Sequence, residues 1–125
     1  MKRKCIQFAT ILFLLVCCRG SLLAHHGTAG YDMDKTVTLK GVVTSFEFVN
    51  PHAELRVDVT DENGHTVSWL AETNNPNRLA RRGWNRDVLK PGDVITISGN
   101  PVKSGNLNLR LTKVTLADGR ELDPL

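Results

Sequence analysis

The stretch NNPNRLARRGW, residues 74–84, interrupts an otherwise strand-like chain and predicts a short helix over residues 76–82. Asn75 is a residue type that caps helix N-termini, and Pro76 suits the first helical position, where its missing N–H would have had no partner. Gly83 suits the left-handed conformation in which many helices end. The core contacts expected from this helix are Leu79 and Ala80.

Upstream of the helix, apolar and polar residues alternate with a period of two, which is typical of strands with one buried face. The first strand is expected over residues 37–49, where Val42, Phe46 and Phe48 share a face. The alternation slips by one residue at Gly41, so we expect a β-bulge there.

Two further strands are expected over residues 53–60 and 66–72. Asn63-Gly64 lies between them and is a strong hairpin signal, because both residues tolerate positive φ. The three upstream strands therefore form a meander. The residues expected to point inward from the second and third strands are Ala53, Leu55, Val57, Val59, Val67, Trp69 and Ala71.

Two more strands are expected downstream of the helix, over residues 94–99 and 107–116. Ile95 and Ile97 point inward from the fourth strand. Within the fifth strand, the alternation slips again near Thr112. The residues that share a face before that slip are Leu107, Leu109 and Leu111.

Five strands with one short helix between the third and fourth is the element order of an OB-fold. The sequence therefore predicts an all-β fold, a small five-stranded OB-fold-like barrel. A five-stranded sandwich is the competing fold, and alternation alone does not separate the two. The helix at residues 76–82 favours the barrel.

Residues 1–24 have the features of a secretory signal peptide, with a basic start, a short apolar run and Ala24 at the cleavage site. The run is too short for a comfortable transmembrane helix, so no membrane anchor is expected after cleavage. A lipoprotein acylated at Cys17 or Cys18 is the less favoured alternative. We expect residues 25–36 to be an N-terminal extended segment, residues 37–122 to be the barrel domain, and the protein to be periplasmic or secreted.

Removal of this leader changes the charge and the cysteine content. It takes away Cys5, Cys17 and Cys18 and four of the 16 Lys and Arg residues, which leaves 12 basic residues against 13 acidic ones. The mature chain then has no thiol and no excess positive charge to attract nucleic acid. The outward face of the second and third strands also lacks aromatic rings for base stacking, so nucleic acid is not an expected partner. That face carries Glu54, Arg56, Asp58, Ser68 and Glu72.

The histidines are the first candidate site, because imidazole is the commonest protein ligand for copper, zinc and nickel. Cleavage after Ala24 makes His25 the first residue, whose α-amine and Nδ1 could chelate one ion with His52 as a further ligand. Cleavage one residue earlier places His26 third from the amine, as in square-planar copper and nickel motifs. The alternative is that the pair is a solvated chain end. His65 follows the hairpin turn and is left out of the site.

The second candidate site is the arginine helix. Arg78, Arg81 and Arg82 are three and four residues apart, so their guanidinium groups can gather on one flank, with Trp84 directly after them. Such a group could hold an acidic small molecule, a glycan or a partner protein. The alternative is a solvated flank, with Trp84 in the core.

The sequence contains none of the common catalytic motifs, in which particular residue types recur at a fixed spacing. It has no Gly-x-Ser-x-Gly elbow, no phosphate-binding loop and no His-Glu-x-x-His. The sequence therefore favours a binding module, or a structural accessory protein, over an enzyme. Copper redox chemistry at the amino terminus is the remaining catalytic alternative.

Several motifs occur in one order along the mature chain, and together they resemble a known family. The chain is similar to small bacterial exported proteins classed as a domain of unknown function, and the resemblance spans nearly the whole mature sequence. It implies a periplasmic or secreted location and brings no activity with it. The motifs are Ala24-His25-His26, Asn50-Pro51-His52, NPNRLARRGW (75–84), LKPGD (89–93) and VTLADGREL (114–122).

Overall fold

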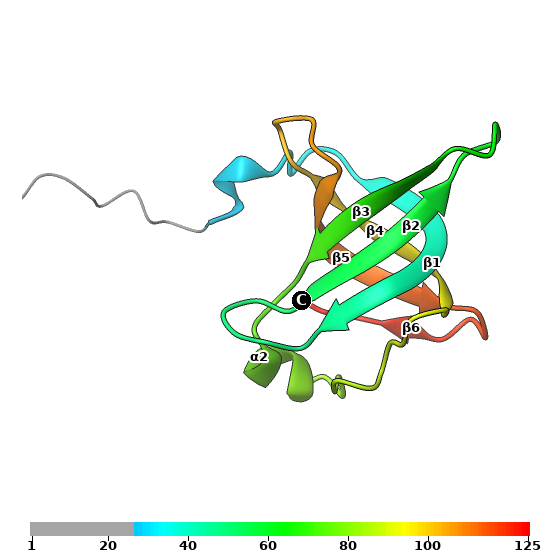
Figure 1. Ribbon diagram of the computed structural model, residues 1–125. Helices are drawn as coiled ribbons and strands as arrows, with labels where there is room; N and C mark the ends of the chain where they lie inside the picture. The colour runs from blue at the N-terminus through cyan, green and yellow to red at the C-terminus, as the bar shows by residue number, and fades with distance from the viewer. Residues whose placement is uncertain (1–26) are drawn as a thin grey trace, which may run out of the picture.

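The computed structural model describes residues 27–125 and shows a closed five-stranded barrel (Figure 1). The sheet order is β3-β2-β1-β4-β5-β6, and a parallel pairing of β3 with β5 closes the barrel. The OB-fold-like barrel is therefore confirmed. Its elements are η1 (Thr28–Gly30), β1 (Val37–Glu47), β2 (Glu54–Thr60), β3 (Thr66–Glu72), α2 (Pro76–Ala80), β4 (Val94–Pro101), β5 (Asn108–Leu116) and β6 (Glu121–Leu122).

Strand β1 carries a bulge, but not where the alternation placed it. Its pairing with β2 shifts register between Val43 and Ser45. Val43 is buried, whereas Val42 is 41% exposed, so the expectation that Val42 shares the face of Phe46 and Phe48 is wrong.

Gly41 has a different role from the expected bulge. A Cβ built at this position would collide with the backbone oxygen of Asp58 and would lie 2.6 Å from Cγ1 of Val57. The glycine therefore permits β1 to approach β2 closely. The alternation of inward and outward residues along β1 continues without a slip as far as Val43.

Strands β2 and β3 have the expected inward residues except at the hairpin end. Ala53, Leu55, Val57 and Ala71 are fully buried, and Asn63-Gly64 lies in the turn with Gly64 at φ +82°. Val67 is 42% exposed, contrary to expectation. The reason is that β5 pairs only with the other end of β3, from Leu70 to Glu72, so the barrel wall does not extend to Val67.

Helix α2 forms as expected and ends slightly earlier. The Asn75 side chain accepts a hydrogen bond from the Arg78 backbone N–H at 3.0 Å, and Gly83 has φ +84°. Leu79 is fully buried, but Ala80 is exposed, because the helix turns that side toward solvent. Ala80 is therefore not a core residue.

The bulge expected near Thr112 in β5 is confirmed. The register against β4 shifts so that Lys113 faces Ser98 and Leu111 faces Gly99, and the Thr112 hydroxyl donates to the Ser98 backbone oxygen at 3.0 Å. Leu107 was expected in the same strand, but it precedes β5 and is 43% exposed. Strand β6 was not expected; it is two residues long and pairs with the end of β5.

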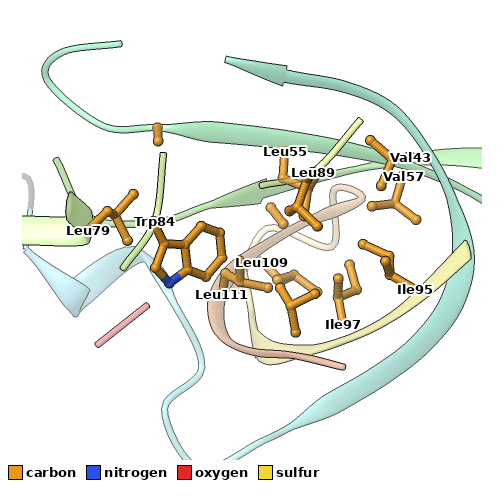
Figure 2. Packing of buried hydrophobic residues seen from close by; sticks show 13 residues of the cluster. Val43, Leu55, Val57, Leu79, Trp84, Leu89, Ile95, Ile97, Leu109 and Leu111 are labelled. Atoms are coloured by element: carbon orange, nitrogen blue, oxygen red, sulfur yellow. The ribbon is translucent and has the colours of Figure 1, made fainter. Parts of the chain in front are cut away.

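The core fills the barrel and continues under its base (Figure 2). Leu79 and Trp84 lie at one end of the cluster, and Ile95 and Val57 lie toward the other. The Trp84 ring centroid is 5.9 Å from that of Phe46. The remaining buried apolar residues are Val43, Ala53, Leu55, Ala71, Leu89, Ile97, Leu109, Leu111 and Val114.

The C-terminal residues fasten α2 and Trp84 to the barrel. The backbone oxygen of Asp123 accepts from Nε1 of Trp84 at 3.2 Å, and that of Pro124 accepts from Nδ2 of Asn74 at 2.6 Å. Arg82 also pairs with the Asp123 carboxylate at 2.5 Å. Within residues 27–125, no helix has the length and apolar character needed to cross a membrane.

Candidate functional site

A pocket of about 390 Å³ lies on the side of the barrel where β3 and β5 meet. His52 from the β1–β2 loop and Arg78 from α2 both line it. They belong to two separate sites in the sequence interpretation, and the structure brings them together. The other lining residues are Gly27, Thr28, Tyr31, Glu72, Thr73, Asn74, Asn75, Arg110, Leu111 and Leu125.

The position of His52 is set by its neighbour in the chain. Ala53 is fully buried, its N–H donates to the Asn74 oxygen at 3.0 Å, and its oxygen accepts from the Thr73 N–H at 3.0 Å. These bonds hold the β1–β2 loop against the segment that leads into α2. His52 itself is exposed and follows the cis Asn50–Pro51 peptide.

Residues 30–35, which precede β1, are docked along the barrel. Tyr31 forms a β-bridge with Val102, and the Lys103 N–H donates to the Gly30 oxygen at 2.9 Å. Nδ2 of Asn100, a buried side chain, donates to the Lys35 oxygen at 2.7 Å. These contacts place the η1 end of the described chain beside the β4–β5 loop (Figure 1) and at the pocket.

A polar network forms one wall of the pocket. The Tyr31 hydroxyl donates to Oε2 of Glu72 at 2.8 Å, and Nδ2 of Asn108 donates to Oε1 of the same carboxylate at 3.1 Å. Burial raises the pKa of Tyr31 well above its usual range; the hydrogen bond to Glu72 and its negative charge act in the same direction, and Arg110 opposes them. Sequence reasoning missed Tyr31 and Arg110 and placed Glu72 on an open outer face.

The pKa of Tyr31 gives a direct test of this network. Tyr31 is the only tyrosine in the chain, so the absorbance of tyrosinate reports its ionisation alone. We expect the folded protein to titrate above the ordinary pKa of about 10, and Glu72→Gln to bring the midpoint back toward it. A midpoint near the ordinary value in the folded wild type would contradict the network.

The same shift has a consequence for stability. The folded pKa of Tyr31 is raised, so the native state keeps the proton at a pH where the unfolded state has lost it. The stabilisation is therefore fully present below about pH 10 and is lost as the pH rises above that value. Circular dichroism during the alkaline titration follows this loss.

The histidines separate into two locations. His65 lies at the hairpin tip with Nδ1 3.5 Å from the Asp61 carboxylate, and β2 runs its seven residues, roughly 20 Å, between that tip and the loop of His52. His25 and His26 lie outside the described residues. Among residues 27–125, no group of three or more His, Cys, Asp and Glu side chains is arranged to hold a metal ion.

The arginine helix does not present its charges as one group. Arg78 lines the pocket, Arg82 is paired with Asp123, and Arg81 is exposed and not among the lining residues. Trp84 is 2% exposed, so its ring offers no face to a ligand and lies in the core. Of the four residues expected to bind an acidic ligand, the structure brings only Arg78 to the pocket.

The protein-family model described as "Family of unknown function (DUF6152)" matches residues 13–110. The expected likeness to a family of unknown function is thereby confirmed. No curated protein matches the chain. A solved crystal structure of TiaS in complex with a tRNA and ATP includes a chain that is similar at 18% identity with a TM-score of 0.48, over 69% of this chain. The present chain spans only 19% of that chain, and the likeness carries no argument about function.

Proposed function

Because the chain belongs to DUF6152, a family of unknown function, its role must be inferred from its own residues, and we propose an exported binding module for a divalent metal ion. Copper is the first choice, with zinc and nickel as alternatives, because imidazole suits all three. The proposed ligands are His25, His26 and His52. One observation carries the proposal: Gly27, which directly follows His26, lines the same pocket as His52.

The docked N-terminal segment supports this proposal. A peptide bond joins His26 to Gly27, so their Cα atoms are about 3.8 Å apart. Gly27 is itself close to a point of attachment, because Tyr31 is bridged to Val102 and bonded to Glu72. Because Gly27 lines the pocket together with His52, we propose that gathering the histidine ligands round one ion costs less entropy than it would at a free chain end.

The cleavage point selects between two ligand sets. If His25 is the first residue, its α-amine and ring nitrogen bind together and His52 adds a second imidazole. If Ala24 is the first residue, the amine, the intervening backbone nitrogens and His26 form a square-planar set, which suits copper(II) or nickel(II). The intact mass of the exported protein, measured with its metal retained, identifies both the first residue and the ion.

Copper(II) titration of the exported, processed protein tests the function. If His25 is the first residue, we expect one ion per chain, and we expect His52→Ala to raise the dissociation constant at least about 10-fold, because even an outer-shell partner of a metal is worth that much. His25→Ala is expected to weaken binding at least as strongly. His65→Ala is the matched control, since that side chain is 80% exposed at the far hairpin, and it should leave the affinity unchanged.

Sub-stoichiometric uptake that none of the histidine substitutions alters would contradict metal binding. Strong binding that depends on His25 but not on His52 would contradict the part played by the pocket. It would mean that the chain end alone holds the ion.

A further inference from the structure

We propose that the pocket holds the carboxylate group of a small organic acid between Arg78 and Arg110. This inference goes beyond metal binding and stands without it. The two guanidinium groups come from different elements, α2 and β5, and both line the pocket. No ion pair among residues 27–125 includes either one, whereas Arg82 and Arg120 do have carboxylate partners.

The acidic residue in the pocket does not take the place of such a ligand. Glu72 faces Arg110 across the β3–β5 pairing, but its two carboxylate oxygens accept hydrogen bonds from Tyr31 and Asn108. The network thus turns the carboxylate toward neutral donors. Among the side chains that line the pocket, two are guanidinium groups, Arg78 and Arg110, and one is a carboxylate, Glu72.

The surroundings favour a short, charge-assisted contact. Arg110 is partly buried, and a guanidinium in that setting binds a carboxylate more strongly than one in open water, often through two parallel hydrogen bonds. The hydroxyl of Thr73, in the same wall, is buried and has no hydrogen-bond partner among the described residues. It is an uncommitted polar group of a residue that lines the same pocket as the two arginines.

The size of the pocket indicates the class of ligand. About 390 Å³ is at the lower end of the range for small-molecule sites, which run from roughly 300 to 1,000 Å³. Asn74, Asn75 and Thr28 add polar atoms to the lining. A hydroxylated carboxylic acid fits this lining, either as a free acid or as a uronic acid at the end of a glycan.

Nuclear magnetic resonance titration of the metal-free mature protein tests this site. The probes are D-galacturonate, its trimer, succinate and inorganic phosphate. We expect a carboxylate to shift the resonances of Gly27, Tyr31 and Arg110. Tighter binding of the trimer than of the monomer would indicate a glycan source, and equal binding would indicate a free acid.

Variants locate the contact. Arg110→Gln and Arg78→Gln should each weaken binding at least about 10-fold, as expected for loss of a charge-assisted hydrogen bond. Arg81→Gln, on the same helix but outside the pocket, is the matched control and should change the affinity by less than about twofold. Arg110→Lys keeps the charge and loses the planar fork, so it should also weaken binding; it serves as the second variant if Arg110→Gln does not fold.

Three results would overturn the site. One is that no carboxylate binds more tightly than about 10 mM. Another is that phosphate alone binds. The third is that Arg81→Gln weakens binding as much as Arg78→Gln does, which would indicate attraction to the whole helix surface. Because the protein is free of metal, none of these results depends on metal binding by the histidines.

Discussion

Replacement of Trp84 by alanine is expected to lower the free energy of unfolding by about 3–5 kcal/mol, as is usual for a large buried aromatic residue. The side chain is 2% exposed and packs against Phe46 at the base of the barrel. Its Nε1 also donates to the Asp123 oxygen, which helps to hold the C-terminal residues against α2. Trp84→Ala therefore has two effects: it leaves a cavity in the core and it removes this hydrogen bond.

Urea unfolding followed by circular dichroism measures this loss, and the fluorescence of Trp69 remains as a second probe. Trp84→Phe is the control, because it keeps a buried ring and removes the N–H donor; its loss should be clearly smaller than that of Trp84→Ala. A loss below about 1 kcal/mol for Trp84→Ala would show that the ring is not part of the core.

A single methyl group at Gly41 is expected to lower the free energy of unfolding by about 2–3 kcal/mol, the upper part of the range for overpacking. The Cβ of Gly41→Ala would meet the backbone oxygen of Asp58 and Cγ1 of Val57. A backbone atom cannot move aside without separating β1 from β2, and Val42 and Val43 pair with β2 at this point.

Gly30→Ala is the matched control for Gly41→Ala. No atom lies within 4 Å of a Cβ at Gly30, so the methyl group meets nothing, and a change within about 0.5 kcal/mol is expected. Equal stability of the two variants would contradict the close contact of β1 with β2. Thermal unfolding of both variants and the wild type provides the comparison.

The fold was predictable because its decisive signals are local. Asn75, Pro76 and Gly83 mark the ends of α2, Asn63-Gly64 marks the hairpin, and alternation marks the strands. The slip at Thr112 was correctly placed, because leucines and valine on both sides fix the phase. The slip in β1 was misplaced, because a glycine has no side chain to show which face it occupies.

The pocket was not predictable from local patterns. Glu72 alternates as an outward residue of β3, and its hydrogen bond with Tyr31, 41 residues away, is not visible in that alternation. Arg110 reaches the same place through the parallel pairing of β3 with β5. Both contacts are long-range in sequence, and neither leaves a periodic signal. The sequence singled out His52 and Arg78 because of their chemistry, but their convergence on one pocket depends on the closed barrel.

Pulsed electron paramagnetic resonance of the exported protein, loaded with one copper(II), tests the central claim most directly, because it counts the imidazole groups bound to the ion. The account predicts that the His52→Ala spectrum shows one coordinated imidazole fewer than the wild type. The His65→Ala spectrum should match the wild type. Identical spectra for His52→Ala and the wild type would contradict a metal site shared by the amino terminus and the pocket.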